Sequence, residues 1–150
     1  MKTVIIYHSE HHGNTEKIVR AIAEQGDVTL LKTPDIAGAN LSSYDLIGFA
    51  SGIYYGKFHD SVLQFAREHL PSEKSVFFLY TCGADRKGYT ADLLEIAGEK
   101  EANPVGTWHC PGFDTFGPFK LIGGIAKGRP NEEDISGAVQ FFMKMTTEKT

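Results

Sequence analysis

The sequence predicts a doubly wound α/β fold, with a five-stranded parallel sheet inside a three-layer α/β/α sandwich. Three observations predict it. Short apolar runs alternate with amphipathic segments, a polar loop with a glycine joins the first run to the first helical pattern, and the fourth run is almost wholly apolar. Alternating strands and helices imply right-handed crossovers between parallel strands. A continuously apolar strand is typical of a parallel sheet covered on both faces.

The short apolar runs are interpreted as strands because they are rich in β-branched residues and are bounded by polar, glycine or proline residues. The predicted strands are Thr3–Tyr7, Val28–Lys32, Asp45–Ala50, Ser75–Tyr80 and Val105–Cys110. The segment Pro34–Ser43, between the second and third strands, has the composition of a loop.

Four segments carry apolar residues at helical spacing. The predicted helices are Glu16–Gln25, Asp60–Leu70, Thr90–Lys100 and Asn131–Lys144. Gly26 is expected as the C′ residue of the first helix, and Pro71 ends the second. Asn131 is expected to cap the last helix, with acidic residues in its first turn. The long connection Pro111–Pro130 is expected to cover part of the core or a ligand.

The chain has 150 residues, 41% hydrophobic and 23% charged, which suits one domain spanning residues 1–150. Its net charge of −4 and dispersed basic residues argue against a nucleic-acid partner. No apolar run has the length of a membrane span, and the start of the chain lacks a signal peptide. A cytoplasmic monomer is expected, away from membranes, with Cys82 and Cys110 reduced.

The loop Ser9–Thr15 is predicted to bind a phosphate group. It follows a strand and opens a helix, so unpaired N–H groups and the positive end of the helix dipole point into it. Gly13 can adopt a positive φ, and the hydroxyls of Ser9 and Thr15 add further donors. The alternative is an ordinary strand-to-helix turn with Asn14 or Thr15 as the N-cap.

Two further loops are expected beside this one. Ligands of doubly wound sheets lie outside the carboxyl ends of the strands, where the strand order reverses. The loops that follow the first, third and fourth strands are Ser9–Thr15, Ser51–His59 and Thr81–Tyr89.

These three loops together resemble the FMN-binding loops of the flavodoxin family, and the resemblance spans the whole chain. Gly13, Asn14 and Thr15 match the end of the family's phosphate loop, and Ser9 matches its opening hydroxyl. The resemblance implies the strand order 2-1-3-4-5 and FMN as the cofactor. The FMN-binding residues that it implies are Ser9, His11, His12, Gly13, Asn14, Thr15, Ser51, Gly52, Ile53, Tyr54, Tyr55, Gly56, Thr81, Cys82, Gly83 and Tyr89.

The chain departs from the family pattern in two places. His11 and His12 stand where family phosphate loops usually have hydroxyls. Electron-carrying flavodoxins also tend to surround the flavin with acidic residues. Here the cations Lys57, Arg86 and Lys87 flank the flavin loops, alongside Asp60 and Asp85.

The resemblance favours an electron carrier. It implies that Tyr54, Tyr55 or Phe58 encloses the flavin ring together with Tyr89, and that FMN passes single electrons between a reductase and acceptor proteins through transient interfaces.

Two other functions stay open. One is an FMN-dependent oxidoreductase, like the flavodoxin-related quinone reductases or protoporphyrinogen oxidases, for which Lys57 and Arg86 are the argument. The other is a binding module that has kept the fold and lost the flavin. No catalytic side chain is predicted.

The histidines do not predict a metal centre. His8, His59, His69 and His109 are not spaced as metal ligands usually are. The sequence therefore predicts no metal site.

Overall fold

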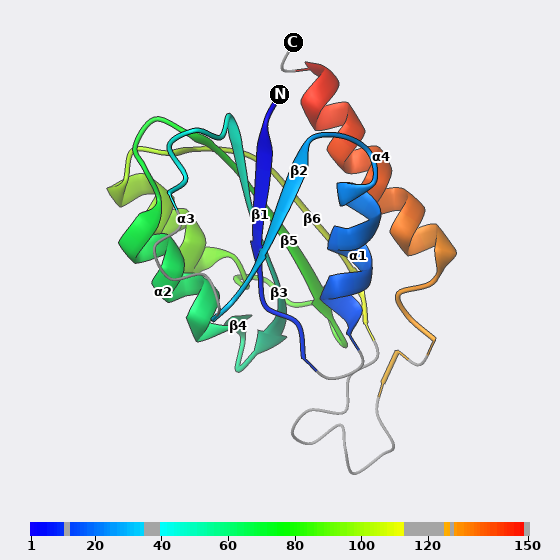
Figure 1. Cartoon of the computed structure of the whole chain (residues 1–150). Helices are drawn as coiled ribbons and strands as arrows, with labels where there is room; N and C mark the ends of the chain where they lie inside the picture. The colour runs from blue at the N-terminus through cyan, green and yellow to red at the C-terminus, as the bar shows by residue number, and fades with distance from the viewer. Residues whose placement is uncertain (11–12, 35–39, 113–124, 127, 149–150) are drawn as a thin grey trace.

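The computed structural model of the protein describes residues 1–10, 13–34, 40–112, 125–126 and 128–148. A twisted sheet lies between two layers of helices, with α2 and α3 on one face and α1 and α4 on the other (Figure 1). The predicted three-layer α/β/α fold is confirmed.

The sheet is built from parallel strands with one short antiparallel addition. The strands are β1 (Thr3–Tyr7), β2 (Val28–Lys32), β3 (Leu46–Tyr54), β4 (Lys57–Phe58), β5 (Ser75–Cys82) and β6 (Asn103–Pro111). Their order is β2-β1-β3-β5-β6, and β4 pairs only with β3, in antiparallel orientation. The five parallel strands therefore have the predicted order 2-1-3-4-5, because β5 and β6 are the fourth and fifth of them.

The helices are α1 (Asn14–Ala23), α2 (Asp60–His69), α3 (Ala91–Glu99) and α4 (Glu132–Glu148). α1 begins two residues earlier than predicted and ends earlier as well. Its C-cap is Glu24, whose φ of −71° is right-handed. The prediction that Gly26 is the C′ residue is wrong, because the chain leaves the helix before reaching that glycine.

Strand β1 supplies both halves of the hydrophobic core. Val4 and Ile6 pack into the cluster on the α2 and α3 side, while Ile5 and Tyr7 pack into the cluster on the α1 and α4 side. Successive side chains of a strand point to opposite faces, so every residue of this strand is buried. Each aliphatic side chain so buried contributes about 1.5–3 kcal/mol.

The prediction that a loop follows Ala50 is wrong. β3 continues to Tyr54 because Ser51 and Gly52 stay in register with Tyr80 and Thr81 of β5. The chain then reverses and Lys57–Phe58 pairs back as β4. Most of the predicted loop Ser51–His59 is therefore a β-hairpin.

Helix α4 begins with the cap that the sequence predicts. The Asp134 amide donates to Asn131 Oδ1 at 3.0 Å, and the Asn131 amide donates to Asp134 Oδ2 at 2.9 Å. Arg129 adds a two-pronged contact, with Nε and Nη2 each 2.6 Å from a carboxylate oxygen of Asp134. These donors, the guanidinium first among them, lower the pKa of Asp134.

Asp134→Asn is expected to lower the free energy of unfolding by about 1–2 kcal/mol at neutral pH, because a charged acceptor for several donors is lost. A carboxyl whose pKa is depressed by folding stabilises the protein above its unfolded pKa, and this contribution disappears as the pH falls through the folded pKa. Urea unfolding from neutral to acidic pH should therefore show wild type and variant converging. Glu133→Gln, an exposed change in the same helical turn, is the control, and a pH-independent gap for Asp134→Asn would contradict the assignment.

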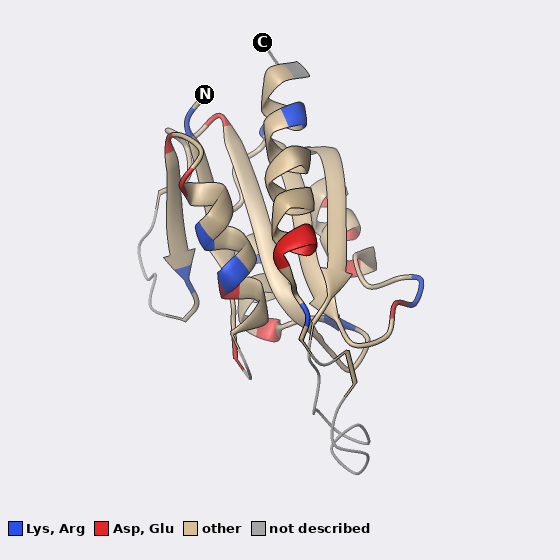
Figure 2. Ribbon diagram, turned by 90° about the vertical axis from the view of Figure 1, so that its right-hand side faces the viewer, with Lys and Arg blue, Asp and Glu red and all other residues tan. Residues whose placement is uncertain are grey.

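Basic and acidic residues are interspersed over the face made by α1 and α4 (Figure 2). In the described part of the chain, no helix is both long and apolar enough to cross a bilayer.

Cys82 and Cys110 are free and buried, and burial raises the pKa of the Cys110 thiol to about 12. Residues 113–124 of the long connection lie outside the described residues, as do residues 35–39 of the predicted loop 34–43.

Candidate functional site

The first loop leads from the end of β1 into α1. Gly13 is the N-cap, with φ of 64° in the left-handed region, and among the described residues no heavy atom beyond its chain neighbours lies within 4 Å of where its Cβ would be. Ser9 Oγ accepts a hydrogen bond from the Glu16 amide at 3.1 Å. Ser9 therefore lies against the first turn of α1.

The second segment is the β3–β4 hairpin. Tyr55 and Gly56 form its turn with φ of 53° and 80°, and a pair of positive φ values is the geometry that suits the twist of a two-residue hairpin. Ser51 closes the base, because its Oγ accepts from the His59 amide at 3.0 Å. Tyr55 is 87% exposed at the tip, so its ring is presented to the surroundings.

The third segment follows β5. The Tyr89 hydroxyl donates to the Ala84 carbonyl at 2.8 Å, and its ring meets Tyr80 edge-on at 5.6 Å between centroids. The Tyr80 hydroxyl donates to Asp85 Oδ1 at 3.1 Å. Burial is the main cause that raises the pKa of Tyr80, and the hydrogen bond to Asp85 is the next. The phenol therefore stays a donor at physiological pH. The loop is therefore held in shape by its own side chains.

Two contacts fix the start of α1 at the carboxyl ends of the strands. Thr15 Oγ1 of α1 lies 3.1 Å from Thr81 Oγ1 of β5, and both hydroxyls are buried. Gly112, after β6, packs on Asn14 so closely that a Cβ there would lie 2.7 Å from Nδ2. The start of α1 is thus fixed against the carboxyl ends of β5 and β6.

The cations near the site differ in their surroundings. Lys57 Nζ lies 3.0 Å from Asp60 Oδ1, and this hydrogen bond lowers the pKa of Asp60. Arg86 and Lys87 lie exposed on the third loop. The Lys57 charge is therefore opposed by a neighbouring carboxylate.

A pair of histidines lies beneath the hairpin. The rings of His8 and His59 stack at 3.6 Å between centroids with 6° between planes, and Tyr54 meets both rings edge-on. Burial, and then the neighbouring His59, lowers the pKa of His8. His8 is therefore neutral at physiological pH.

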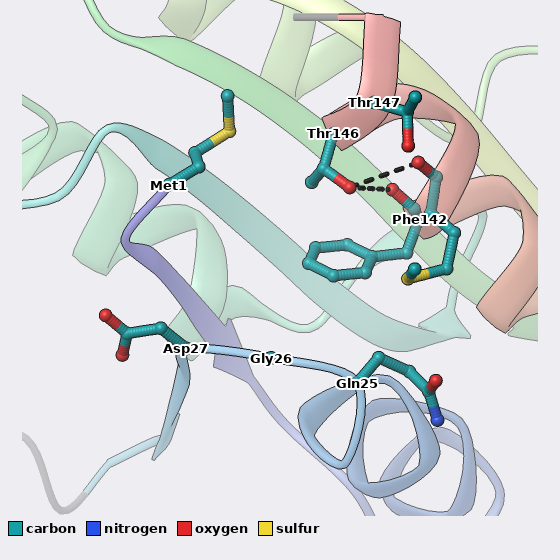
Figure 3. A pocket seen from close by; sticks show the side chains of 8 residues that line it. Met1, Gln25, Gly26, Asp27, Phe142, Thr146 and Thr147 are labelled. Atoms are coloured by element: carbon teal, nitrogen blue, oxygen red, sulfur yellow. Dashed lines mark hydrogen bonds between the residues drawn. The ribbon is translucent and has the colours of Figure 1, made fainter. Parts of the chain in front are cut away.

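A cavity elsewhere in the molecule lies at the opposite edge of the sheet. It opens between the N-terminus, the end of α1 and the last turns of α4 (Figure 3). Its lining residues are Met1, Gln25, Gly26, Asp27, Phe142, Met143, Thr146 and Thr147. The amino ends of the strands meet there, so this cavity is separate from the loops described above.

The carboxyl edge of the sheet thus offers amide and hydroxyl donors at a helix N-terminus, next to a hairpin and a loop with aromatic residues. The model of the flavodoxin domain family matches residues 4–112, which include all three segments. The chain belongs to the flavodoxin family.

Similar proteins match this chain in length or in fold. The chain is 37% identical over 143 residues to an uncharacterized protein of Methanocaldococcus jannaschii, covering 94% of this chain and 95% of the relative. Its fold matches oxidised flavodoxin 2 from Bacillus cereus with a TM-score of 0.72 and 19% identity over 99% of both chains. It also matches a flavoprotein from Lactobacillus acidophilus solved in complex with FMN, with a TM-score of 0.56 and 20% identity over 72% of this chain and 92% of that one.

The flavodoxin fold distributes the predicted site residues over distinct environments. Ser9, Gly13, Asn14, Thr15 and Thr81 gather around the start of α1. The residues from the hairpin are Ser51, Gly52, Ile53, Tyr54, Tyr55 and Gly56, and those from the end of β5 are Thr81, Cys82 and Gly83. Tyr89 closes the third loop. His11 and His12 lie outside the described residues.

One of the aromatic residues expected at the flavin lies in the hydrophobic core instead. Phe58 is fully buried in the core, so its ring cannot stack on a flavin.

The pairing of His8 with His59 was not predicted from the sequence. The only local signal was that His8 continues the alternation of Val4 and Ile6 along β1, which places its side chain on the α2 face.

Proposed function

We propose that this flavodoxin-family protein binds FMN and carries single electrons between a reductase and acceptor proteins. One observation carries the proposal: the N-terminus of α1 is fixed against the carboxyl ends of β5 and β6 through Thr15, Thr81 and Gly112, and the hairpin strand β3 pairs with β5 at the same end of the sheet. FMN, when bound, supplies the redox chemistry.

The residues at the start of α1 fit a phosphate monoester. The first N–H groups of the helix have no intrahelical partner, and the helix dipole favours an anion there. Among the described residues, nothing beyond the chain neighbours of Gly13 fills the space that its Cβ would take. Thr15 and Thr81 add hydroxyl groups that can turn toward an anion.

The hairpin and the third loop would hold the flavin ring. Tyr55 and Tyr89 come from the two segments that flank the start of α1, and either ring can stack on a planar aromatic ligand. The exposure of Tyr55 at the hairpin tip also suits brief contact with partner proteins, whose interfaces in electron transfer are small. The Lys57–Asp60 ion pair supports a carrier over an oxidoreductase, because a cation with a carboxylate neighbour attracts a reduced flavin less strongly.

Anaerobic reductive titration of the purified protein tests this proposal. A carrier is expected to be yellow, to take up its two electrons in separate one-electron stages visible by absorbance and electron paramagnetic resonance, and to show no turnover with NAD(P)H and quinones. Direct two-electron reduction with quinone turnover would favour the oxidoreductase. A colourless protein that does not take up added FMN would favour the binding module.

Removing the whole Lys57–Asp60 pair sharpens the comparison of carrier and oxidoreductase. If the charge of Lys57 is balanced by Asp60, the double variant Lys57→Gln/Asp60→Asn should keep the reduction potentials close to those of the wild type, whereas Lys57→Gln alone should lower them because Asp60 is left without its cation. A selective fall in the two-electron potential of the double variant would support the oxidoreductase.

A further inference from the structure

A second polar cluster lies beside the proposed FMN site. It joins the end of β1 to the start of α2 and consists of His8, Glu10 and His59. His8 Nε2 lies 3.1 Å from Glu10 Oε1, and one ligand atom from each of the three residues lies within 4.8 Å of the others. Two imidazoles and a carboxylate are the donor set that zinc and similar divalent transition metals prefer.

The His8 ring is buried in a way that its protein neighbours do not explain. His8 is only 6% exposed, and among the described residues its Nε2 has no well-aligned hydrogen-bond partner, although Glu10 is near. A buried ring nitrogen without a hydrogen bond destabilises the fold, because its desolvation is not compensated. A cation between Nε2 and the carboxylate would remove this cost.

The opposite ring nitrogens are held by a chain of hydroxyls. His59 Nδ1 lies 2.8 Å from Ser61 Oγ, which lies 2.6 Å from Thr33 Oγ1, and His8 Nδ1 lies 3.4 Å from the same Thr33 oxygen. Thr33 Oγ1 donates to the Tyr7 carbonyl at 3.3 Å. A carbonyl can only accept, so this end of the chain favours a proton on His8 Nδ1 and a lone pair on His8 Nε2. His59 Nδ1 instead accepts from the Ser61 amide, so His59 must change tautomer to bind a metal through Nε2.

Metal-binding histidines usually donate their second N–H to such an outer partner. We infer that His8, His59 and Glu10 form a site for a divalent transition metal of the zinc type, with Thr33 and Ser61 orienting the imidazoles. Coordination positions left over would be open to water or a small anion.

Two features of the cluster oppose metal binding. The Ser61 amide donates to His59 Nδ1 at 3.1 Å as the cap of α2, and a proton on Nδ1 would break that bond. The stacked rings must also tilt so that their lone pairs converge. The free energy of metal coordination has to offset both costs.

The test is binding of Zn²⁺ to the full-length protein as purified, after treatment with a chelator. Isothermal titration is expected to give one equivalent, and Co²⁺ should give the visible absorption of a site with imidazole ligands. His59→Gln and Glu10→Gln should each weaken Zn²⁺ binding about 100-fold, and Thr33→Val about 10-fold. Glu10 is exposed, so its substitution keeps the test valid even if changes at His8 or His59 impair folding.

His69→Gln is the matched control, because His69 also lies beside a glutamate, with Nε2 3.7 Å from Glu68, but outside this cluster. Its Zn²⁺ affinity should equal that of the wild type. The inference is overturned if the wild-type protein shows no saturable Zn²⁺ binding, or if His59→Gln binds as tightly as wild type. Loss of binding in a His11→Gln/His12→Gln variant with retention in His59→Gln would likewise overturn it. None of these readouts depends on FMN.

Discussion

Asn14→Asp is expected to weaken FMN binding about 100-fold while leaving the fold intact. The substitution keeps the shape of the side chain and places a negative charge at the first residue of α1, where the proposed site holds the phosphate. Two like charges about 5 Å apart at an effective dielectric constant of about 20 repel by about 3 kcal/mol, or about two orders of magnitude in affinity. The helix itself tolerates the change, because acidic residues are favourable in the first turn.

Fluorescence titration of the apoprotein with FMN and with riboflavin measures this effect. Riboflavin lacks the phosphate, so its affinity should be the same for wild type and Asn14→Asp. Asn103→Asp makes the same change at the amino end of β6, on the opposite edge of the sheet, and should leave FMN binding unchanged. Equal losses of FMN and riboflavin affinity, or an unchanged FMN affinity, would show that the phosphate is not bound at the start of α1.

Gly48→Ala is expected to lower the free energy of unfolding by about 2–4 kcal/mol, the upper range for added volume in a packed core. Gly48 lies in the middle of β3, and a Cβ there would overlap the ring of Phe77, with Cε2 at 2.6 Å and Cε1 at 2.8 Å. Phe77 is fully buried and packs on Phe141 and Phe142, so its ring has no free space to enter.

Urea denaturation measures the free energy of unfolding of Gly48→Ala, with a second glycine substitution, expected to be stabilising, as the control. Gly98 lies exposed in α3, and among the described residues no heavy atom beyond its own stretch of helix lies within 4 Å of the position that an added methyl group would occupy. Gly98→Ala should therefore stabilise the protein by about 0.5–1 kcal/mol. Adding Phe77→Leu to Gly48→Ala should restore part of the stability by making room. A Gly48→Ala protein as stable as wild type would show that the β3 backbone and the Phe77 ring are not in contact.

The fold and the strand order could be predicted because their signals are local. The β-branched runs, the apolar fourth strand and the amphipathic helices each fit within a few residues of sequence. The cap of α4 could be predicted for the same reason, since Asn131 and Asp134 are only three residues apart. The extent of β3 was not. Its last residues pair with β5 and β4, and these partners are known only from the folded register.

The hairpin escaped prediction for a chemical reason. Tyr55 and Gly56 make a turn that needs two positive φ values, and the usual marker for it is Asn or Asp before the glycine. Tyrosine is not typical of that position, so the segment was interpreted as a loop.

The amino-acid sequence alone determined the family, the layers of the sandwich and the phosphate-loop candidate, because short-range patterns encode strands, helices and the turn between them. The tertiary structure alone decided which side chains meet. It joined Thr15 to Thr81 and stacked His8 on His59, since these pairs are far apart in the chain and come together only through the register of the parallel strands. The spacing of residues along the sequence does not predict such contacts, because the packing of the sheet determines them.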